Sequence, residues 1–458
     1  MGSDGLYYSH EQIKDIVSYA SDRGIRVMPE FDMPGHVTSW LVGYPELASG
    51  PGPFGIIRTW GVQDPTFDPT KEETYRFLDR FFAEMTQLFP DAYMHIGGDE
   101  NNGKYWDANQ DIQEFMKTND IPDNHALQSY FNLKILKILT KYNRKLVGWD
   151  EILQPEMPTD IVIQSWRGRK SLFESAKKGY QGILSNGYYI DLIQPTDFHY
   201  LNDPLPSDSA LTDAQKKLIL GGEATMWSEI VTYENVDSRI WPRTAAIAER
   251  LWSPESVNDV RDMYRRLDVV SLTLEDLGLT HEKNYDAMLR RLANGRDITA
   301  LKIFMDAIEP VKRYQRHRVR KYTSYSPLTR VVDAARPDVA AARSFRWRMD
   351  AYLDGDASVA EHLKASLELW KNNHDNLKAT IDKSPVLKEI ETMSEDLSKC
   401  ADIGLTLLRI HDSDEDFDNQ WLTSIFDYFQ ELKDRKEEIE LMILPALEKL
   451  ARATEKKG

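Results

Sequence analysis

The sequence predicts an α/β fold of the TIM-type (β/α) barrel class, followed by a C-terminal α-helical region. Through about residue 255, short continuous apolar runs alternate with amphipathic helical patterns, which is typical of a parallel sheet covered on both faces. Polar or aromatic residues follow nearly every apolar run, at the edge where parallel barrels carry their sites. Beyond residue 255 the pattern is almost purely helical. These observations together indicate the fold class.

The expected elements follow from apolar periodicity and from the residues that cap helices. The expected helices are 9–24, 71–89, 125–142 and one that begins just after Pro242. The expected strands are 25–32, 92–96, 146–151, 161–166, 182–185 and 218–223. A long irregular loop is expected to end near Pro69, and loops of this length inside compact domains usually shape a site.

Three domains are expected along the chain. They are a barrel over 1–255 that is incomplete at its N-terminus, a helical extension over 256–345 that packs on the barrel, and a helical bundle over 346–458. The bundle would contain helices near 356–381, 385–410 and 417–454. The acidic run 412–416 resembles the start of a calcium loop but lacks the glycine and the closing glutamate, so a solvated turn is expected there.

The composition excludes several classes of partner and cofactor. A net charge of −17 argues against a nucleic-acid partner or an anionic membrane surface. Cys400 is the one cysteine, so the chain can form neither an internal disulfide nor a cysteine metal cage. No apolar run approaches the roughly 20 residues of a membrane span. Residues 1–25 lack the pattern of a signal peptide, and the compartment stays unknown.

The stretch from His95 to Glu100 carries the strongest chemical signal. An apolar strand leads into Gly97 and Gly98, and Asp99 and Glu100 follow directly. Like charges this close push their pKa values apart, so one acid can hold a proton while its neighbour stays ionised. The alternative is a strand-end turn with two solvated acids. Similar positions after other strands argue for a shared pocket, and their residues are Asp32, His36, Trp149, Asp150, Trp166, Tyr189, Asp191, Trp227 and Glu229.

Two adjacent acids favour one mechanism of glycoside cleavage. Most glycosidases place their two carboxylates on opposite faces of the sugar, at least about 5 Å apart. Neighbouring acids fit the substrate-assisted exception, in which the 2-acetamido oxygen of the sugar is the nucleophile. A metal site built from His36, His95, Asp99 and Glu100 is the alternative. It is disfavoured because the histidine spacing matches no common site and the tryptophans would be unexplained.

Four motifs resemble those of the family 20 β-N-acetylhexosaminidases, in the order in which the family carries them. They are Pro29-Glu30-Phe31-Asp32-Met33-Pro34-Gly35-His36, His95-Ile96-Gly97-Gly98-Asp99-Glu100, Gly148-Trp149-Asp150-Glu151 and Met226-Trp227-Ser228-Glu229. The resemblance covers about residues 5–255. Residues 281–345 are similar to the C-terminal extension of Bacteroides-type members.

This resemblance implies a role for each candidate residue. Glu100 would be the general acid and base, Asp99 would orient the acetamido group, and Tyr189 would donate to its oxygen. The remaining residues would bind the sugar or support the acids: Trp149, Trp166 and Trp227 as pocket walls, Asp191 and Glu229 on the outer hydroxyls, and Asp32, His36 and His95 behind Glu100. The implied substrate is a glycan ending in N-acetylhexosamine. The implied enzyme needs no metal or other cofactor, could form a homodimer, and has relatives that are often periplasmic or secreted.

The N-terminus departs from the family pattern. Family members begin with a strand carrying an arginine that holds the sugar hydroxyls, and a second strand follows, whereas residues 1–8 lead straight into a helix. Six strands instead of eight would leave open edges. We therefore expect a truncated chain, with a partner that supplies the strands or a rearranged barrel as alternatives. A catalytically impaired homologue or a glycan-binding module is the alternative function.

Overall fold

The computed structural model describes residues 7–413 and 418–456. The chain forms two compact units: Met1–Tyr188 with Asp203–Glu223, and Tyr189–Asn202 with Ala224–Gly458. The predicted boundaries at 255 and 345 fall inside the second unit, and the division into three domains stays a prediction. The acidic run 412–416 lies largely outside the described residues. Within the described part of the chain, no helix is both long and apolar enough to span a membrane.

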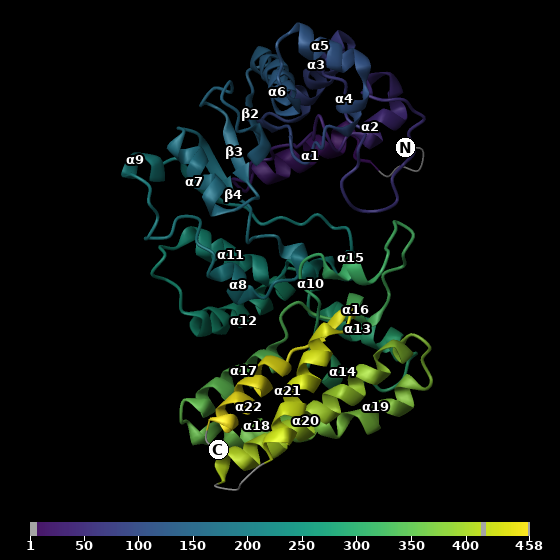
Figure 1. The fold of residues 1–458 in the computed structure, drawn as a ribbon, viewed down its shortest axis with the longest axis vertical. Helices are drawn as coiled ribbons and strands as arrows, with labels where there is room; N and C mark the ends of the chain where they lie inside the picture. The colour runs from purple at the N-terminus through teal and green to yellow at the C-terminus, as the bar shows by residue number, and fades with distance from the viewer. Residues whose placement is uncertain (1–6, 414–417, 457–458) are drawn as a thin grey trace. The chain divides into compact units, whose positions relative to one another are not determined.

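The first unit is built on a five-stranded parallel sheet, as the continuous apolar runs predicted. Its strands follow one another in chain order, and Figure 1 shows β2, β3 and β4 side by side. They are β1 (Tyr93–His95), β2 (Lys145–Trp149), β3 (Val162–Ser165), β4 (Gln181–Leu184) and β5 (Ile219–Gly222). Because the strands are parallel, the residues after each carboxyl end meet at one edge of the sheet.

The strand predicted over 25–32 is wrong as a continuous strand. Glu30 forms an isolated parallel bridge with His95. The His95 N–H donates to the Pro29 carbonyl at 3.0 Å, and the Phe31 N–H donates to the His95 carbonyl at 2.9 Å. Pro29 has no N–H to donate, so the ladder cannot extend backwards. The segment still lies beside β1 and brings Asp32 to the end of that strand.

Helices cover the sheet of the first unit close to their predicted bounds. They include α1 (His10–Ser21), α3 (Glu72–Leu88) and α6 (Asn124–Lys141). The remaining helices are α2 (Thr38–Gly43), η1 (Pro45–Leu47), α4 (Lys104–Ala108), α5 (Gln110–Thr118), η2 (Asp150–Ile152), α7 (Arg169–Lys177) and α9 (Asp213–Lys216). One apolar core joins sheet and helices, with Phe82, Met94, Phe131, Ile135, Leu146 and Ile163 among its fully buried members. The long loop before Pro69 contains α2 and η1 and is therefore partly helical.

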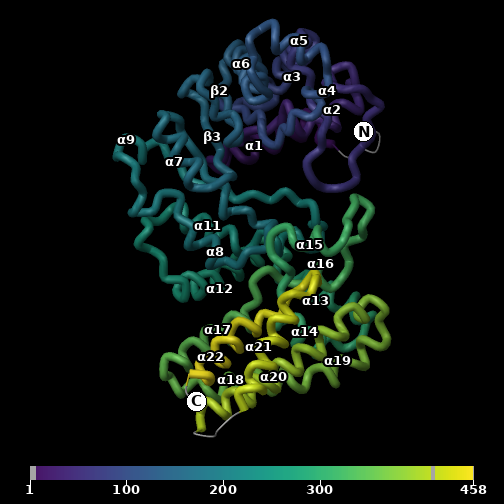
Figure 2. The backbone as a smooth tube through the Cα atoms, viewed as in Figure 1, coloured from purple at the N-terminus to yellow at the C-terminus, as the bar shows by residue number. Residues whose placement is uncertain are grey.

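The second unit is mainly helical. Its elements up to residue 353 are η3 (Ile190–Leu192), α8 (Thr196–Tyr200), α10 (Val236–Ile240), α11 (Arg243–Trp252), α12 (Val260–Asp276), α13 (Lys283–Leu292), α14 (Thr299–Met305), β6 (Ile308–Pro310), α15 (Gln315–Val319), α16 (Val331–Ala334) and α17 (Ala340–Leu353). They are followed by η4 (Ala357–Val359), α18 (Ala360–Lys371), α19 (Asn373–Ile381), η5 (Leu387–Ile390), α20 (Glu391–Asp412), α21 (Asn419–Asp434), β7 (Ile439–Leu441) and α22 (Leu444–Glu455). Figure 2 shows the C-terminal segment returning alongside the earlier helices of this unit.

Two helices predicted for the bundle are wrong as single helices. The helix expected over 356–381 is divided into η4, α18 and α19. The helix expected over 417–454 is interrupted by β7, which pairs antiparallel with β6. One apolar core runs from Tyr285 to Ala451 and includes residues of β6 and β7. The extension and the bundle therefore share a core, which explains why a strand replaces helix at 439–441.

Candidate active site

The turn after β1 is made by two glycines in left-handed conformations. Gly97 has φ +68° and Gly98 has φ +101°, which side chains other than glycine rarely adopt. A Cβ on Gly97 would lie 1.8 Å from Oδ1 of Asp32 and 2.8 Å from its Cα. The Gly98 N–H donates to Asp32 Oδ1 at 3.1 Å. A glycine at position 97 therefore allows Asp32 to approach the turn that carries Asp99 and Glu100.

His36 lies between the two acids that follow the turn. Its Nε2 is 3.5 Å from Asp99 Oδ2 and 3.4 Å from Glu100 Oε2. The hydrogen bond to Asp99 raises the pKa of His36 to about 9, with further contributions from Asp32 and Glu100 against the effect of burial. The imidazole thus carries a positive charge at neutral pH beside both carboxylates. The structure thus brings Asp99, Glu100 and His36 together.

Asp32 completes this cluster from below. Burial, with the nearby Asp99, raises the pKa of Asp32 to about 9. One possible ligand atom from each of Asp32, His36 and Asp99 lies within 4.8 Å of the other two, a spacing that could also hold a cation.

Glu30 holds Trp149 and lies beside His95. The Trp149 indole N–H donates to Glu30 Oε1 at 2.9 Å, and His95 Nδ1 lies 3.3 Å from the same oxygen. The Gly97 N–H donates to His95 Nδ1 at 3.0 Å. The rings of His95 and Trp149 meet edge to face with centroids 5.0 Å apart. His95 therefore fixes both the glycine turn and one predicted aromatic wall.

A polar pair in the sheet, the buried Gln164 and the partly buried Glu223, was not predicted. The Gln164 side-chain amide donates to Glu223 Oε1 at 2.7 Å and to Ser185 Oγ at 2.8 Å. Burial raises the pKa of Glu223. Gln164 stands in an apolar run and Glu223 ends another, and buried polar residues at such positions are the signal that could have found them.

Trp166 is held by Glu151, an acid for which no role was predicted. Its indole N–H donates to Glu151 Oε2 at 3.1 Å, and Arg167 donates to Glu151 Oε1 at 2.9 Å. Burial raises the pKa of Glu151. Asp150 accepts from the Arg167 backbone N–H at 2.8 Å and so joins the ends of β2 and β3. The first unit thus positions two of the three predicted tryptophans through indole hydrogen bonds.

The second unit contains the other four predicted site residues. Tyr189 bridges Thr225 in parallel, and its ring lies 6.2 Å from that of Trp227. The Trp227 backbone N–H donates to Asp191 Oδ2 at 2.9 Å. Glu229 follows two residues later and is exposed. Tyr189, Asp191, Trp227 and Glu229 are therefore gathered by two neighbouring loops of this unit.

The charge on Asp191 is tuned by burial and by its neighbours. Burial raises the pKa of Asp191 to about 6; the Trp227 N–H and Arg243 oppose this rise, and Glu229 adds to it. Arg243 is fully buried and donates to the Ile190 carbonyl at 2.7 Å. Burial lowers the pKa of Arg243 to about 10, so it stays a cation at neutral pH. The Arg243 cation thus opposes the effect of burial on Asp191.

The first part of the chain matches the model of a known protein family. The model of glycosyl hydrolase family 20, catalytic domain, matches residues 2–255. The chain belongs to glycosyl hydrolase family 20. A β-hexosaminidase of Porphyromonas gingivalis is 36% identical over 293 residues, covering 60% of this chain and 38% of that protein. The β-hexosaminidase subunit beta of Rattus norvegicus is 38% identical over 271 residues, covering 57% of this chain and 50% of that subunit. The family 20 chain thus spans about half the length, or less, of these curated relatives.

Solved structures agree with this assignment. A chitobiase of Flavobacterium johnsoniae is 41% identical with a TM-score of 0.91, covering 98% of this chain and 69% of that one. A β-N-acetylhexosaminidase of Bacteroides fragilis is 28% identical with a TM-score of 0.52, covering 60% of this chain and 57% of that one. The first likeness covers nearly the whole chain and therefore includes most of the helical part.

Proposed function

We propose that this family 20 protein is an exo-β-N-acetylhexosaminidase. It would remove terminal, non-reducing β-linked N-acetylglucosamine or N-acetylgalactosamine with retention of configuration. The observation that supports this most directly is the placement of Asp99 and Glu100 on either side of one imidazole nitrogen of His36. Both acids then belong to one strand end, which suits a reaction whose nucleophile comes from the substrate.

In the proposed first step, Glu100 donates its proton to the glycosidic oxygen as the bond from that oxygen to C1 breaks. The acetamido oxygen attacks C1 and forms a cyclic oxazolinium, and the aglycone leaves as an alcohol. In the second step, Glu100 takes a proton from water, the water oxygen bonds to C1, and the ring opens to the acetamide. Two inversions at C1 give net retention.

Each supporting residue acts on charge or position. Asp99 would accept the acetamido N–H and stabilise the positive charge that develops on the oxazolinium. Asp99 Oδ1 is buried and has no hydrogen-bond partner among the described residues, so it has an acceptor to offer. Trp149 and Trp166, oriented by Glu30 and Glu151, would form apolar walls around the acetamido methyl group. Tyr189 would donate to the acetamido oxygen.

Release of nitrophenol from the aryl N-acetyl-β-glucosaminide tests the proposal, with the aryl β-glucoside as the substrate that lacks an acetamido group. We expect turnover of the first substrate alone. Glu100→Gln should lower kcat by roughly 10²–10⁴, the usual contribution of a positioned general acid. Asp99→Asn should lower kcat while the protein stays folded. Glu84→Gln, an exposed acid on α3, is the matched control and should change nothing.

The two alternative functions give different results in the same assay. A glycan-binding module would bind N-acetylglucosamine without releasing nitrophenol. A catalytically impaired homologue would show neither property at ordinary protein concentrations. Equal turnover of the acetamido substrate and the β-glucoside would contradict substrate assistance, because the β-glucoside has no acetamido oxygen.

A further inference from the structure

The turn that carries the two candidate acids has few backbone contacts of its own. Glu100 has φ +51°, a left-handed conformation that residues other than glycine rarely adopt. Among the described residues, neither Asp99 nor Glu100 forms a backbone–backbone hydrogen bond. Strain of this kind persists where neighbouring groups impose it, and it is frequent at functional sites. The conformation of Glu100 therefore depends on contacts made by the residues on either side of the pair.

One side chain, that of Gln128 on α6, bonds to both flanks of the acids. Its amide nitrogen donates at 2.6 Å to the carbonyl of Gly98, the residue before Asp99. Its amide oxygen accepts at 3.4 Å from the side-chain amide of Asn101, the residue after Glu100. A glutamine amide carries donors and an acceptor on one planar group, so a single side chain can fix both flanks at once.

The loop that follows the acids is held by the same face of α6. Asn101 Oδ1 accepts from the Gly103 N–H at 3.1 Å, which continues the restraint along the chain. Asn124 on α6 donates to Asp107 Oδ1 at 2.8 Å. Asn124 and Gln128 are four residues apart and therefore lie on one face of the helix. This face of α6 thus holds the loop at two points.

The helix that carries Gln128 is itself fixed by the core of the first unit. Phe131, Ile135 and Leu139 of α6 are fully buried in the core that contains Met94 of β1. Gln128 is 6% exposed, so solvent has little access to its amide. Loss of a hydrogen bond in such surroundings leaves a backbone carbonyl without a donor. The amide is therefore held on a rigid element, as the precise placement of a site requires.

We propose that Gln128 is a positioning residue that holds Glu100 where its carboxyl group can protonate the glycosidic oxygen. The amide of Gln128 takes no part in the reaction and acts by fixing the backbone on both sides of the acid pair. The inference rests on the proposed hexosaminidase function and deepens it, because it gives a helix outside the sequence motifs a role in general-acid catalysis. Misplacement of a catalytic group by about 1 Å can lower a rate roughly 10²-fold, so a small shift of the turn is measurable.

The dependence of kcat/KM on the leaving group tests this role in Gln128→Met, which keeps the length of the side chain and removes the amide. The substrates are aryl N-acetyl-β-glucosaminides that release phenol or dinitrophenol. Phenol needs a proton from Glu100 as it departs, whereas dinitrophenol leaves as a stable anion. We expect kcat/KM to fall roughly 10- to 100-fold for the phenyl substrate and at most about threefold for the dinitrophenyl substrate.

Asn132→Leu is the matched control. Asn132 is a buried amide on the same helix, one turn after Gln128, and it donates to Gln154 Oε1 at 3.4 Å and not to the turn. Both substitutions replace a buried amide by an apolar group of similar size, so both should lower the melting temperature. Asn132→Leu should nevertheless leave the ratio of kcat/KM for the two leaving groups unchanged.

Gln128→Glu provides a second variant of nearly the same shape as the wild type. A protonated carboxyl group can donate to the Gly98 carbonyl, whereas a carboxylate cannot. Burial raises the pKa of a carboxyl group, so this donor should return as pH falls toward about 5. We expect kcat/KM for the phenyl substrate, relative to the wild type at each pH, to recover over this range. A relative activity that does not change with pH overturns the inference.

The outcomes separate this inference from the proposed function. If the wild type is active and Gln128→Met affects both leaving groups equally, or neither, the inference is overturned and the hexosaminidase proposal stands. If the wild type does not turn over, the imidazole of His36 reports the position of the acids, since its Nε2 lies 3.5 Å from Asp99 Oδ2 and 3.4 Å from Glu100 Oε2. An NMR titration then decides. A pKa of His36 that Gln128→Met lowers by about 0.5 or more, and Asn132→Leu does not, supports the inference; an unchanged pKa overturns it.

Discussion

Substitution of Gly97 by alanine should disable the site by displacing Asp32. The left-handed φ of +68° costs an alanine about 1–2 kcal/mol. The new Cβ would also lie 2.8 Å from the Asp32 Cα, a backbone atom that cannot rotate away as a side chain can. Overpacking of this kind adds about 1–3 kcal/mol. We therefore expect Gly97→Ala to lower the free energy of unfolding of the first unit by about 2–5 kcal/mol.

Gly24→Ala provides a matched control for the backbone strain. Gly24 has nearly the same φ, +71°, but a Cβ there would meet no atom within 4 Å. We expect Gly24→Ala to cost only about 1–2 kcal/mol. Thermal unfolding measures both, at roughly 2–4 °C per kcal/mol for a unit of this size. Nitrophenol release below both transitions should fall for Gly97→Ala and stay unchanged for Gly24→Ala. Equal midpoints and equal rates for the two variants would refute the reasoning.

Two further predictions concern charge in the first unit. His36 and Asp32 both have raised pKa values of about 9, so the folded protein holds protons there that the unfolded chain has lost, His36 above its unfolded pKa of 6.5 and Asp32 above 3.8. These protons are lost as pH rises, so the contribution of His36 to stability should fall between about pH 6.5 and 9 and that of Asp32 between about pH 4 and 9, by up to about 1.4 kcal/mol per pH unit for each group. Asp32→Asn should reduce this fall, and a melting temperature that does not change with pH would contradict the prediction. Glu151→Leu should raise KM about 3- to 10-fold, because it releases the Trp166 indole. Glu151→Gln keeps a hydrogen-bond acceptor and should change KM less. Equal effects of the two variants would show that the charge of Glu151 matters and the indole hydrogen bond does not.

Much of the sheet could be predicted because its strands are short apolar runs bounded by turn residues. β1 to β5 fall within one or two residues of their predicted bounds. The segment 25–32 has the same apolar character, but Pro29 lacks the backbone N–H that would extend the ladder backwards, and a single bridge remains. Pattern alone does not reveal how a proline limits a ladder, since that depends on which neighbour pairs with which N–H.

The break at β7 could not be predicted from local propensity. Residues 431–440 are rich in Glu and Lys, which favour helix. Tertiary contacts override this preference, because Ile439 and Leu441 enter the core beside β6 and Glu438 enters the ionic network. The partners of Glu438 lie more than 100 residues earlier in the chain.

Part of the candidate site likewise follows from local sequence pattern, and part depends on tertiary contacts. The strand-end rule found Asp99 and Glu100, because a carboxyl-end position is a property of the local pattern. It could not find the hydrogen bond from Trp149 to Glu30, whose partners are 119 residues apart and meet only through the pairing beside β1. The two candidate acids were thus visible in the sequence, whereas the residues that hold the neighbouring side chains required the register of the sheet.

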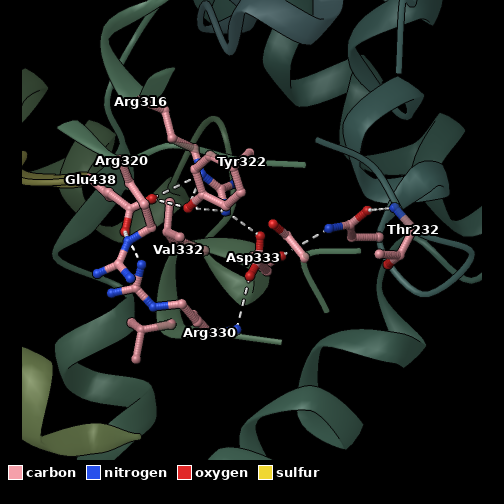
Figure 3. A network of polar contacts seen from close by, with 12 residues as sticks. Thr232, Arg316, Arg320, Tyr322, Arg330, Val332, Asp333 and Glu438 are labelled. Carbon is pink, nitrogen blue, oxygen red and sulfur yellow. Dashed lines mark hydrogen bonds and ion pairs between the residues drawn. The ribbon is translucent and has the colours of Figure 1, made fainter. Parts of the chain in front are cut away.

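The position of the segment after β6 depends on the C-terminal helices in the same way. The Val311 N–H donates to the Glu438 carbonyl, and the Glu438 side chain is surrounded by Arg316, Arg320 and Arg330 (Figure 3). The core that contains β6 and β7 extends through α20 and α22. Packing of these helices therefore determines where residues 311–317 lie, although Glu438 comes 122 residues after Arg316 in the sequence.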